Sequence, residues 1–125
     1  MNFSGKWRLN PAKSRGIGAQ MILATIDHDE PRVSQSMLVT TAAGEERVTY
    51  VFRTDGEESV NLVRGTEART RAHWEGEELI VESSMKTPAR DFRFRDCWSI
   101  APDGTLVMEH RDDDLAGQCA VLDRV

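Results

Sequence analysis

The sequence predicts an all-β protein that folds as a single antiparallel, up-and-down β-barrel of about ten strands, with eight strands as the alternative. Apolar and polar side chains alternate with a period of two along almost the whole chain, which is typical of half-buried strands. Tight turns rich in Asp, Gly and Pro separate most of these stretches. Only one connection, the one after the first strand, is longer than such a turn.

The first predicted strand is Phe3–Leu9, in which aromatic, glycine and leucine positions alternate with polar residues. Asn10 and Pro11 follow it and resemble a helix cap with proline at the first helical position. Gly16 ends any helix quickly, so we expect at most one short helical turn after the first strand. We expect this connection to lie at one end of the barrel and to cover part of its mouth.

Nine further stretches carry the same alternation, and each is bounded by turn residues such as Asp55-Gly56 and Pro102-Asp103-Gly104. The predicted strands are Met21–Asp27, Arg32–Thr40, Glu46–Thr54, Ser59–Val63, Ala68–Trp74, Glu78–Ser84, Arg90–Ile100, Thr105–Arg111 and Gln118–Arg124.

Short turns leave no room for parallel crossovers, so neighbouring strands should pair in antiparallel fashion. An open ten-stranded meander would have two unpaired edges and one large apolar face, and closure into a barrel removes both. A two-sheet sandwich is the competing fold, but it usually needs longer Greek-key connections than these.

Composition excludes several functional classes. The chain has 125 residues, of which 39% are hydrophobic and 30% charged, and this fits one globular domain over residues 1–125. The net charge of −5 argues against a nucleic-acid partner, because contacts to phosphate dominate that affinity. No apolar run approaches the roughly 20 residues of a membrane helix, so we expect no membrane span.

No motif indicates a cofactor, so we expect none. The acidic run over residues 112–117 resembles a calcium loop, but Ala116 occupies a ligand position and no flanking helices are expected. We therefore interpret it as a solvated hairpin turn and expect no metal site.

The two cysteines, Cys97 and Cys119, lie on predicted strands that have another strand between them. That separation of about 9–10 Å is too long for a disulfide, so we expect free thiols and a reducing compartment. The N-terminus shows no signal-peptide pattern. Both observations predict a cytoplasmic protein, or a secreted one if a leader has been removed.

The residues Gly5-Lys6-Trp7 form a Gly-x-Trp motif on the first strand. Together with the long meander, this resembles the calycin superfamily of lipocalins and fatty-acid-binding proteins, and the ten strands resemble the latter branch more. The resemblance implies a barrel that carries a small hydrophobic ligand. It also implies that Gly5 and Trp7 are structural, with Trp7 at the closed end under a basic side chain, for which Arg124 is the candidate through a cation–π contact.

The chain departs from fatty-acid-binding proteins in two places. Residues 10 to 20 are too few for the pair of helices that covers the barrel in that group. The Arg-x-Tyr pair that holds the ligand carboxylate there aligns with Val121 and Asp123. Neither residue provides a cation, so binding of a fatty acid through that clamp is not expected.

Aromatic side chains are expected to share the barrel interior, where they either pack together or line a cavity. By alternation with Trp7 they are Tyr50, Phe52, Trp74, Phe92, Phe94 and Trp98.

Two polar residues fall on the same inward face. Asp96 lies between Phe94 and Trp98, and His110 has the matching position on the next predicted strand. Such a pair inside an apolar barrel would orient a ligand or form a structural hydrogen bond, and it would perturb both pKa values. Gln35 and Thr70 join this group if their strands keep the expected register.

The arginines at alternate positions opposite the core are expected to form an outer face with glutamate and aspartate partners. They are Arg69, Arg71, Arg93 and Arg95.

The favoured function is binding of a small hydrophobic or amphipathic ligand inside the barrel by Tyr50, Phe52, Trp74, Phe94, Asp96, Trp98 and His110. This hypothesis requires an internal cavity of at least about 300 Å³. One alternative is a structural or interaction protein with a filled core. The other is an enzyme in which His110 is a general base oriented by Asp96, and we consider catalysis the less favoured case. The sequence does not predict the oligomeric state.

Overall fold

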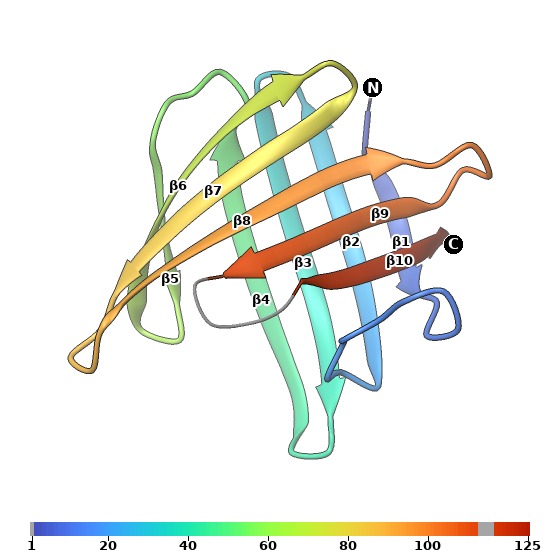
Figure 1. The fold of residues 1–125 in the computed structure, drawn as a ribbon, viewed down its shortest axis with the longest axis horizontal. Coiled ribbons are helices and arrows are strands. Elements are labelled where there is room, and N and C mark those ends of the chain that lie inside the picture. Colours follow the sequence, from blue (N-terminus) through green and yellow to red (C-terminus); the bar gives the residue numbers. More distant parts are fainter. Residues whose placement is uncertain (1, 113–116) are drawn as a thin grey trace.

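The computed structural model describes residues 2–112 and 117–125, which form ten antiparallel strands in a nearly closed up-and-down barrel (Figure 1). This confirms the predicted fold, and the strand ends differ from the predicted ones by a few residues. The strands are β1 (Gly5–Leu9), β2 (Met21–Asp29), β3 (Arg32–Thr41), β4 (Gly44–Arg53), β5 (Ser59–Val63), β6 (Thr66–Glu75), β7 (Glu78–Lys86), β8 (Asp91–Ile100), β9 (Leu106–Asp112) and β10 (Gln118–Arg124).

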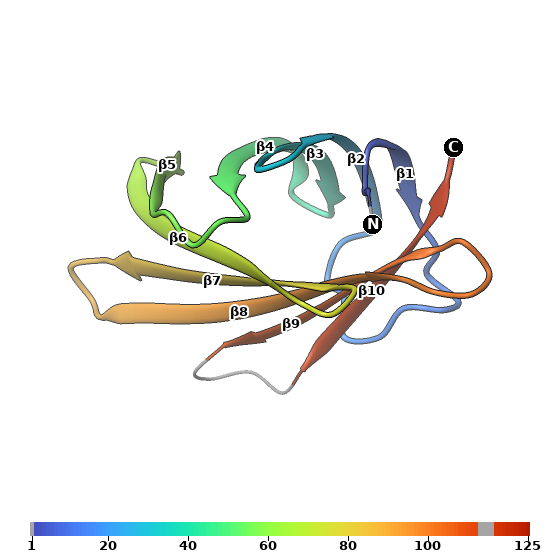
Figure 2. The same cartoon turned by 90° about the horizontal axis from the view of Figure 1, so that it is seen from above.

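The strands follow the order β4-β3-β2-β1-β10-β9-β8-β7-β6-β5, so the first and last strands of the chain pair with each other. Viewed from above, β1–β4 form one wall and β6–β9 the other (Figure 2). The apolar core lies between these walls and is centred on Trp7, Phe52, Leu79, Trp98 and Leu106.

The two ends of the sheet, β4 and β5, meet through side chains. The Asn61 side chain imitates a peptide group: its Oδ1 accepts from the Val51 N–H and its Nδ2 donates to the Val51 carbonyl, both at 2.9 Å. Arg64 and Glu46 form a bidentate ion pair across the same seam, with N–O distances of 2.6 and 2.8 Å. Side-chain hydrogen bonds and an ion pair therefore join β4 and β5, which have no ladder of backbone hydrogen bonds between them.

The connection between β1 and β2 contains a turn at Pro11 and no helix. Its backbone instead pairs with β10, where Arg15 and Cys119 exchange two N–H···O bonds of 2.9 and 3.0 Å. The expected proline-initiated turn is present, but strand pairing along β10 ends it before a helix forms.

One end of the barrel is closed around Trp7. The indole N–H donates to the Phe3 carbonyl at 3.0 Å, and the Arg124 guanidinium carbon lies 4.2 Å from the ring centroid. Gly5 has a φ of +141°, and a Cβ built on it would lie 2.5 Å from Nη1 of Arg124. Glycine is needed here because Arg124 crosses directly over this backbone position.

A cluster of rings extends this closed end. His28 is buried and contacts the rings of Phe3 and Trp74 at centroid distances of 5.6 and 5.9 Å, and these two rings lie 5.8 Å from each other. The Phe3 N–H donates to His28 Nδ1, which leaves Nε2–H to donate to Glu30 at 2.6 Å. Glu30 also accepts from the Trp74 indole at 3.0 Å, so one carboxylate joins two rings of the cluster.

Both cysteines are free thiols, as predicted. Residues 2–112 and 117–125 contain no helix that is long and apolar enough to cross a membrane. Within the same ranges, no group of His, Cys, Asp and Glu side chains is arranged to hold a metal ion. Most of the acidic run that was interpreted as a hairpin turn, residues 113–116, lies outside the described residues.

Candidate functional site

An internal cavity of about 270 Å³ lies between the two walls of the barrel. It is slightly smaller than the about 300 Å³ expected from the sequence, which is the lower end of the range for ligand sites. Both walls contribute to its lining, which is mainly apolar with a few polar groups: Gln35, Met37, Tyr50, Phe52, Thr70, Val81, Ser83, Phe94, Asp96, Trp98, Met108 and His110.

Strand register explains why these side chains meet. Residues directly opposite each other in an antiparallel pair point to the same face of the sheet. Asp96 is opposite His110 on β8 and β9, and Gln35 is opposite Tyr50 on β3 and β4. Two local pairs, one from each wall, thus present their side chains to the same cavity.

Asp96 and His110 form the charged pair of the cavity. Their Oδ1 and Nδ1 atoms are 2.7 Å apart, and both side chains are partly buried. The hydrogen bond that His110 donates to Asp96 raises the pKa of His110, burial opposes this shift, and the charges of Asp96 and Asp112 add to it. The Asp112 carboxylate lies 3.8 Å from the other ring nitrogen. Both nitrogens therefore face carboxylates, and this stabilises the protonated ring.

Gln35 and Tyr50 form the second pair, and it is uncharged. Gln35 is only 5% exposed, and Tyr50 is partly buried. Burial raises the pKa of the Tyr50 hydroxyl, and the negative charge of Asp96 adds to this effect, so the hydroxyl keeps its proton. Among the described residues neither side chain has a hydrogen-bond partner, whereas fully buried side-chain polar atoms all have one. The amide and the hydroxyl thus remain open toward the cavity.

Thr70 and Ser83 face the cavity from β6 and β7. Their hydroxyl oxygens are 3.1 Å apart, so these groups satisfy each other. The sequence indicated Thr70 for this position, as it did Gln35.

Six of the seven residues predicted to bind a ligand line the cavity. Trp74 does not: it belongs to the ring cluster with Phe3 and His28 at the closed end. Sequence reasoning missed Met37, Val81 and Ser83. The strand register could have identified Val81 and Ser83, because they lie opposite the predicted cavity residues Asp96 and Phe94 on β8.

The positions aligned with the carboxylate clamp were misplaced by one residue. Val121 and Asp123 point away from the interior, since their neighbours Ala120 and Leu122 are the residues opposite Met108 and Leu106. The inward positions Ala120 and Leu122 are apolar, and the next one, Arg124, covers Trp7 instead of lining the cavity. Among the described residues, Asp96 and His110 are the ionisable acid and base of the lining.

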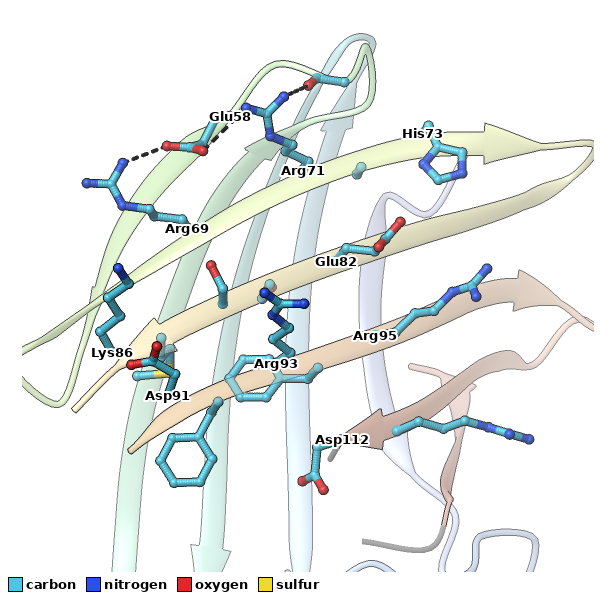
Figure 3. A pocket seen from close by; sticks show the side chains of 18 residues that line it. Glu58, Arg69, Arg71, His73, Glu82, Lys86, Asp91, Arg93, Arg95 and Asp112 are labelled. Carbon is cyan, nitrogen blue, oxygen red and sulfur yellow. Dashed lines mark hydrogen bonds and ion pairs between the residues drawn. The ribbon is translucent and has the colours of Figure 1, made fainter. Parts of the chain in front are cut away.

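A second and larger hollow, of about 730 Å³, lies on the outer face of β6–β8 (Figure 3). Arg69 and Arg71 reach toward Glu58 from β6, with N–O distances of 2.7 and 3.4 Å. Arg95 on β8 lies 3.8 Å from Glu75. These ion pairs give Arg69, Arg71 and Arg95 the acidic partners predicted for the outer face. The hollow is open to solvent, so its exposed pairs contribute little binding energy.

No family model matches this sequence, and no curated protein matches it either. Solved structures do match in three dimensions. Lipid binding protein 8 of Caenorhabditis elegans superposes with a TM-score of 0.74 at 13% identity, covering 98% of this chain and 95% of that one.

Two ligand complexes match similarly. The Schistosoma mansoni fatty acid binding protein with arachidonic acid has a TM-score of 0.68 at 13% identity, covering 98% of this chain and 96% of that one. The zebrafish ileal bile acid-binding protein with cholic acid has a TM-score of 0.69 at 15% identity, covering 98% of each chain. The chain therefore has the calycin fold, in its ten-stranded, fatty-acid-binding-protein-like form.

Proposed function

We propose that this protein binds a small apolar or amphipathic molecule inside its barrel. The observation that carries this proposal is the cavity of about 270 Å³, with an apolar lining and a few convergent polar groups. Such a composition is typical of small-molecule sites. The volume equals that of about nine water molecules, so a ligand with roughly ten non-hydrogen atoms fits.

The solved structures with the same fold support this proposal. They include a fatty acid transporter, a lipid binding protein and a bile acid-binding protein. Fatty acids and bile acids combine an apolar body with a polar end. Phe52, Phe94 and Trp98 would contact the apolar body here. The free thiols agree with the predicted cytoplasmic location.

The geometry supports binding over catalysis. A general base must be unprotonated before the reaction, but the carboxylates of Asp96 and Asp112 both favour protonated His110. Both ring nitrogens face carboxylates, at 2.7 and 3.8 Å, so neither is directed at a ligand in the cavity. The cavity also argues against the alternative of a filled, purely structural core.

The test is titration of the protein with azulene, a neutral ten-carbon dye without hydrogen-bonding groups that quenches tryptophan fluorescence, here that of Trp98 in the cavity wall. We expect saturable binding, which Met108→Trp should abolish because the larger ring fills the cavity. Glu109→Trp is the matched control, because this neighbour is exposed on the outer face and the same ring should leave binding intact. Equal dye binding by both variants would place the dye outside the barrel and contradict the proposal.

A further inference from the structure

We propose that the cavity selects ligands with a neutral hydrogen-bonding head group, such as an alcohol or a primary amide, over carboxylates, and that Gln35 and Tyr50 bind this group. The inference rests on the proposed function and specifies the chemical class of its ligand.

The charges around the cavity disfavour an anion. Among the described residues no lysine or arginine lines it, and His110, the lining side chain that can become cationic, is already paired with Asp96 at 2.7 Å. Asp112 lies 3.8 Å from the other nitrogen of the same ring. A carboxylate would therefore lose its water and approach Asp96 without gaining a free cation. Burial of a charge under those conditions is strongly unfavourable.

Two neutral side chains on one wall of the cavity have free hydrogen-bonding capacity. Gln35 offers two donors and an acceptor, and the Tyr50 hydroxyl offers one donor and an acceptor. Neither has a partner among the described residues, and Gln35 is only 5% exposed. Every fully enclosed side-chain polar atom of the described residues does have a partner, so the Gln35 amide faces the open space of the cavity, where a bound ligand would supply its missing bonds.

The register of β3 and β4 places the Gln35 amide and the Tyr50 hydroxyl close enough to bind the same head group. Gln35 and Tyr50 are directly opposite on β3 and β4, a relationship that holds Cβ atoms about 5 Å apart. Across the cavity, Thr70 and Ser83 already bond to each other. A head group that both donates and accepts would therefore bind at the β3–β4 wall, with its apolar body directed toward Phe52 and Trp98.

The experiment compares decan-1-ol, decanamide and decanoate, which share a chain length and differ in the head group. Each competes with azulene at neutral pH. We expect the alcohol and the amide to bind about tenfold more tightly than decanoate, or better, because each unmatched polar contact costs about that factor. Decanoate binding as tightly as the alcohol would overturn the inference.

Substitutions locate the head group. Gln35→Leu and Tyr50→Phe should each weaken decan-1-ol binding about five- to tenfold while the dye, which makes no such bond, keeps its affinity. Thr49→Val is the matched control, because it removes a hydroxyl next to Tyr50 from the outer face. If Gln35→Leu does not fold, Tyr50→Phe still decides, since it removes one oxygen atom. Unchanged alcohol affinity in Tyr50→Phe and in any folded Gln35→Leu protein would overturn the assignment.

A gain of function completes the test. Gln35→Arg places a cation on the cavity wall, so it should reverse the order and make decanoate the tighter ligand. The two proposals fail differently. If neither the dye nor any competitor binds, the proposed function is wrong and this inference falls with it. If the dye binds but decanoate competes as well as decan-1-ol, only the head-group assignment is wrong.

Discussion

The guanidinium of Arg124, on the last strand, lies over the indole of Trp7, on the first strand, with 4.2 Å between its central carbon and the ring centroid. It also donates to the Ser4 carbonyl at 3.0 Å. This contact joins the two ends of the chain where β1 and β10 pair. Gly5 allows it, because any side chain at that position would occupy the space of the guanidinium.

We therefore expect Gly5→Ala to lower the free energy of unfolding by about 2–3 kcal/mol, through backbone strain and displacement of Arg124. Urea denaturation measures the change. Gly44→Ala is the control, because Gly44 has a similar φ of +124° but no atom within 4 Å of the added Cβ. It should cost only about 1 kcal/mol. Equal losses in the two variants would show that the approach of Arg124 adds nothing.

The sequence predicts local relationships well. The short turn at Pro102-Asp103-Gly104 sets the register of β8 and β9, so alternation alone brings Asp96 opposite His110. The same reasoning extends to Gln35, whose partner strand follows after a tight turn. Within one hairpin, the residues that share a face of the sheet follow from the two-residue period of each strand.

Contacts between strands that are far apart in the sequence cannot be predicted from this two-residue period. Trp74 has the inward parity of the cavity residues, yet it lies further along β6 and stacks on Phe3 and His28. The roles of His28 and Glu30 are not visible in the sequence, because Phe3 lies 25 residues from His28 and Trp74 lies 44 residues from Glu30. Height along the barrel axis depends on how far each strand is staggered, and a single sequence does not reveal that.

The pairing of His110 with Asp96 should make stability depend on pH. The pKa of His110 is raised in the folded protein, so its contribution is fully present below the unfolded pKa, about 6.5, and is lost as pH rises through the folded pKa. We expect the free energy of unfolding to fall as the pH rises above about 6.5, more steeply in the wild type than in Asp96→Asn.

Urea denaturation across this range measures the difference, and an NMR titration of the His110 ring gives the pKa directly. Asp112 also faces the ring, so Asp96→Asn should keep part of the shift. His73→Gln is the control: it removes a histidine from the exposed outer face and should leave the difference in place. A His110 pKa at or below about 6.5 in the wild type would contradict the prediction.

The seam between β4 and β5 should depend on the Asn61 amide. Asn61→Ala leaves the Val51 N–H and carbonyl without their partners, so we expect a loss of about 1–3 kcal/mol in the free energy of unfolding. Hydrogen exchange of the Val51 amide should accelerate more than that of amides inside the β6–β7 ladder. Asn61→Asp keeps the acceptor for the Val51 N–H and should protect that amide better than alanine does. Equal exchange rates of the Val51 amide in all three proteins would show that the Asn61 side chain does not hold β4 and β5 together.

The Cys97 thiol should be nearly inert. Burial raises its pKa to about 12, and the hydrogen bond that the thiol donates to Glu78, at 3.1 Å, adds to the shift. At about pH 8 iodoacetamide should therefore alkylate it roughly a thousandfold more slowly than an ordinary thiol. A Cys119→Ser background isolates the reaction, and the same protein in urea gives the unperturbed rate. Glu78→Gln removes one nearby negative charge and should accelerate alkylation, whereas Glu82→Gln, further along the outer face of β7, should not. Fast alkylation of the folded protein would show that the thiol is neither desolvated nor bonded to Glu78.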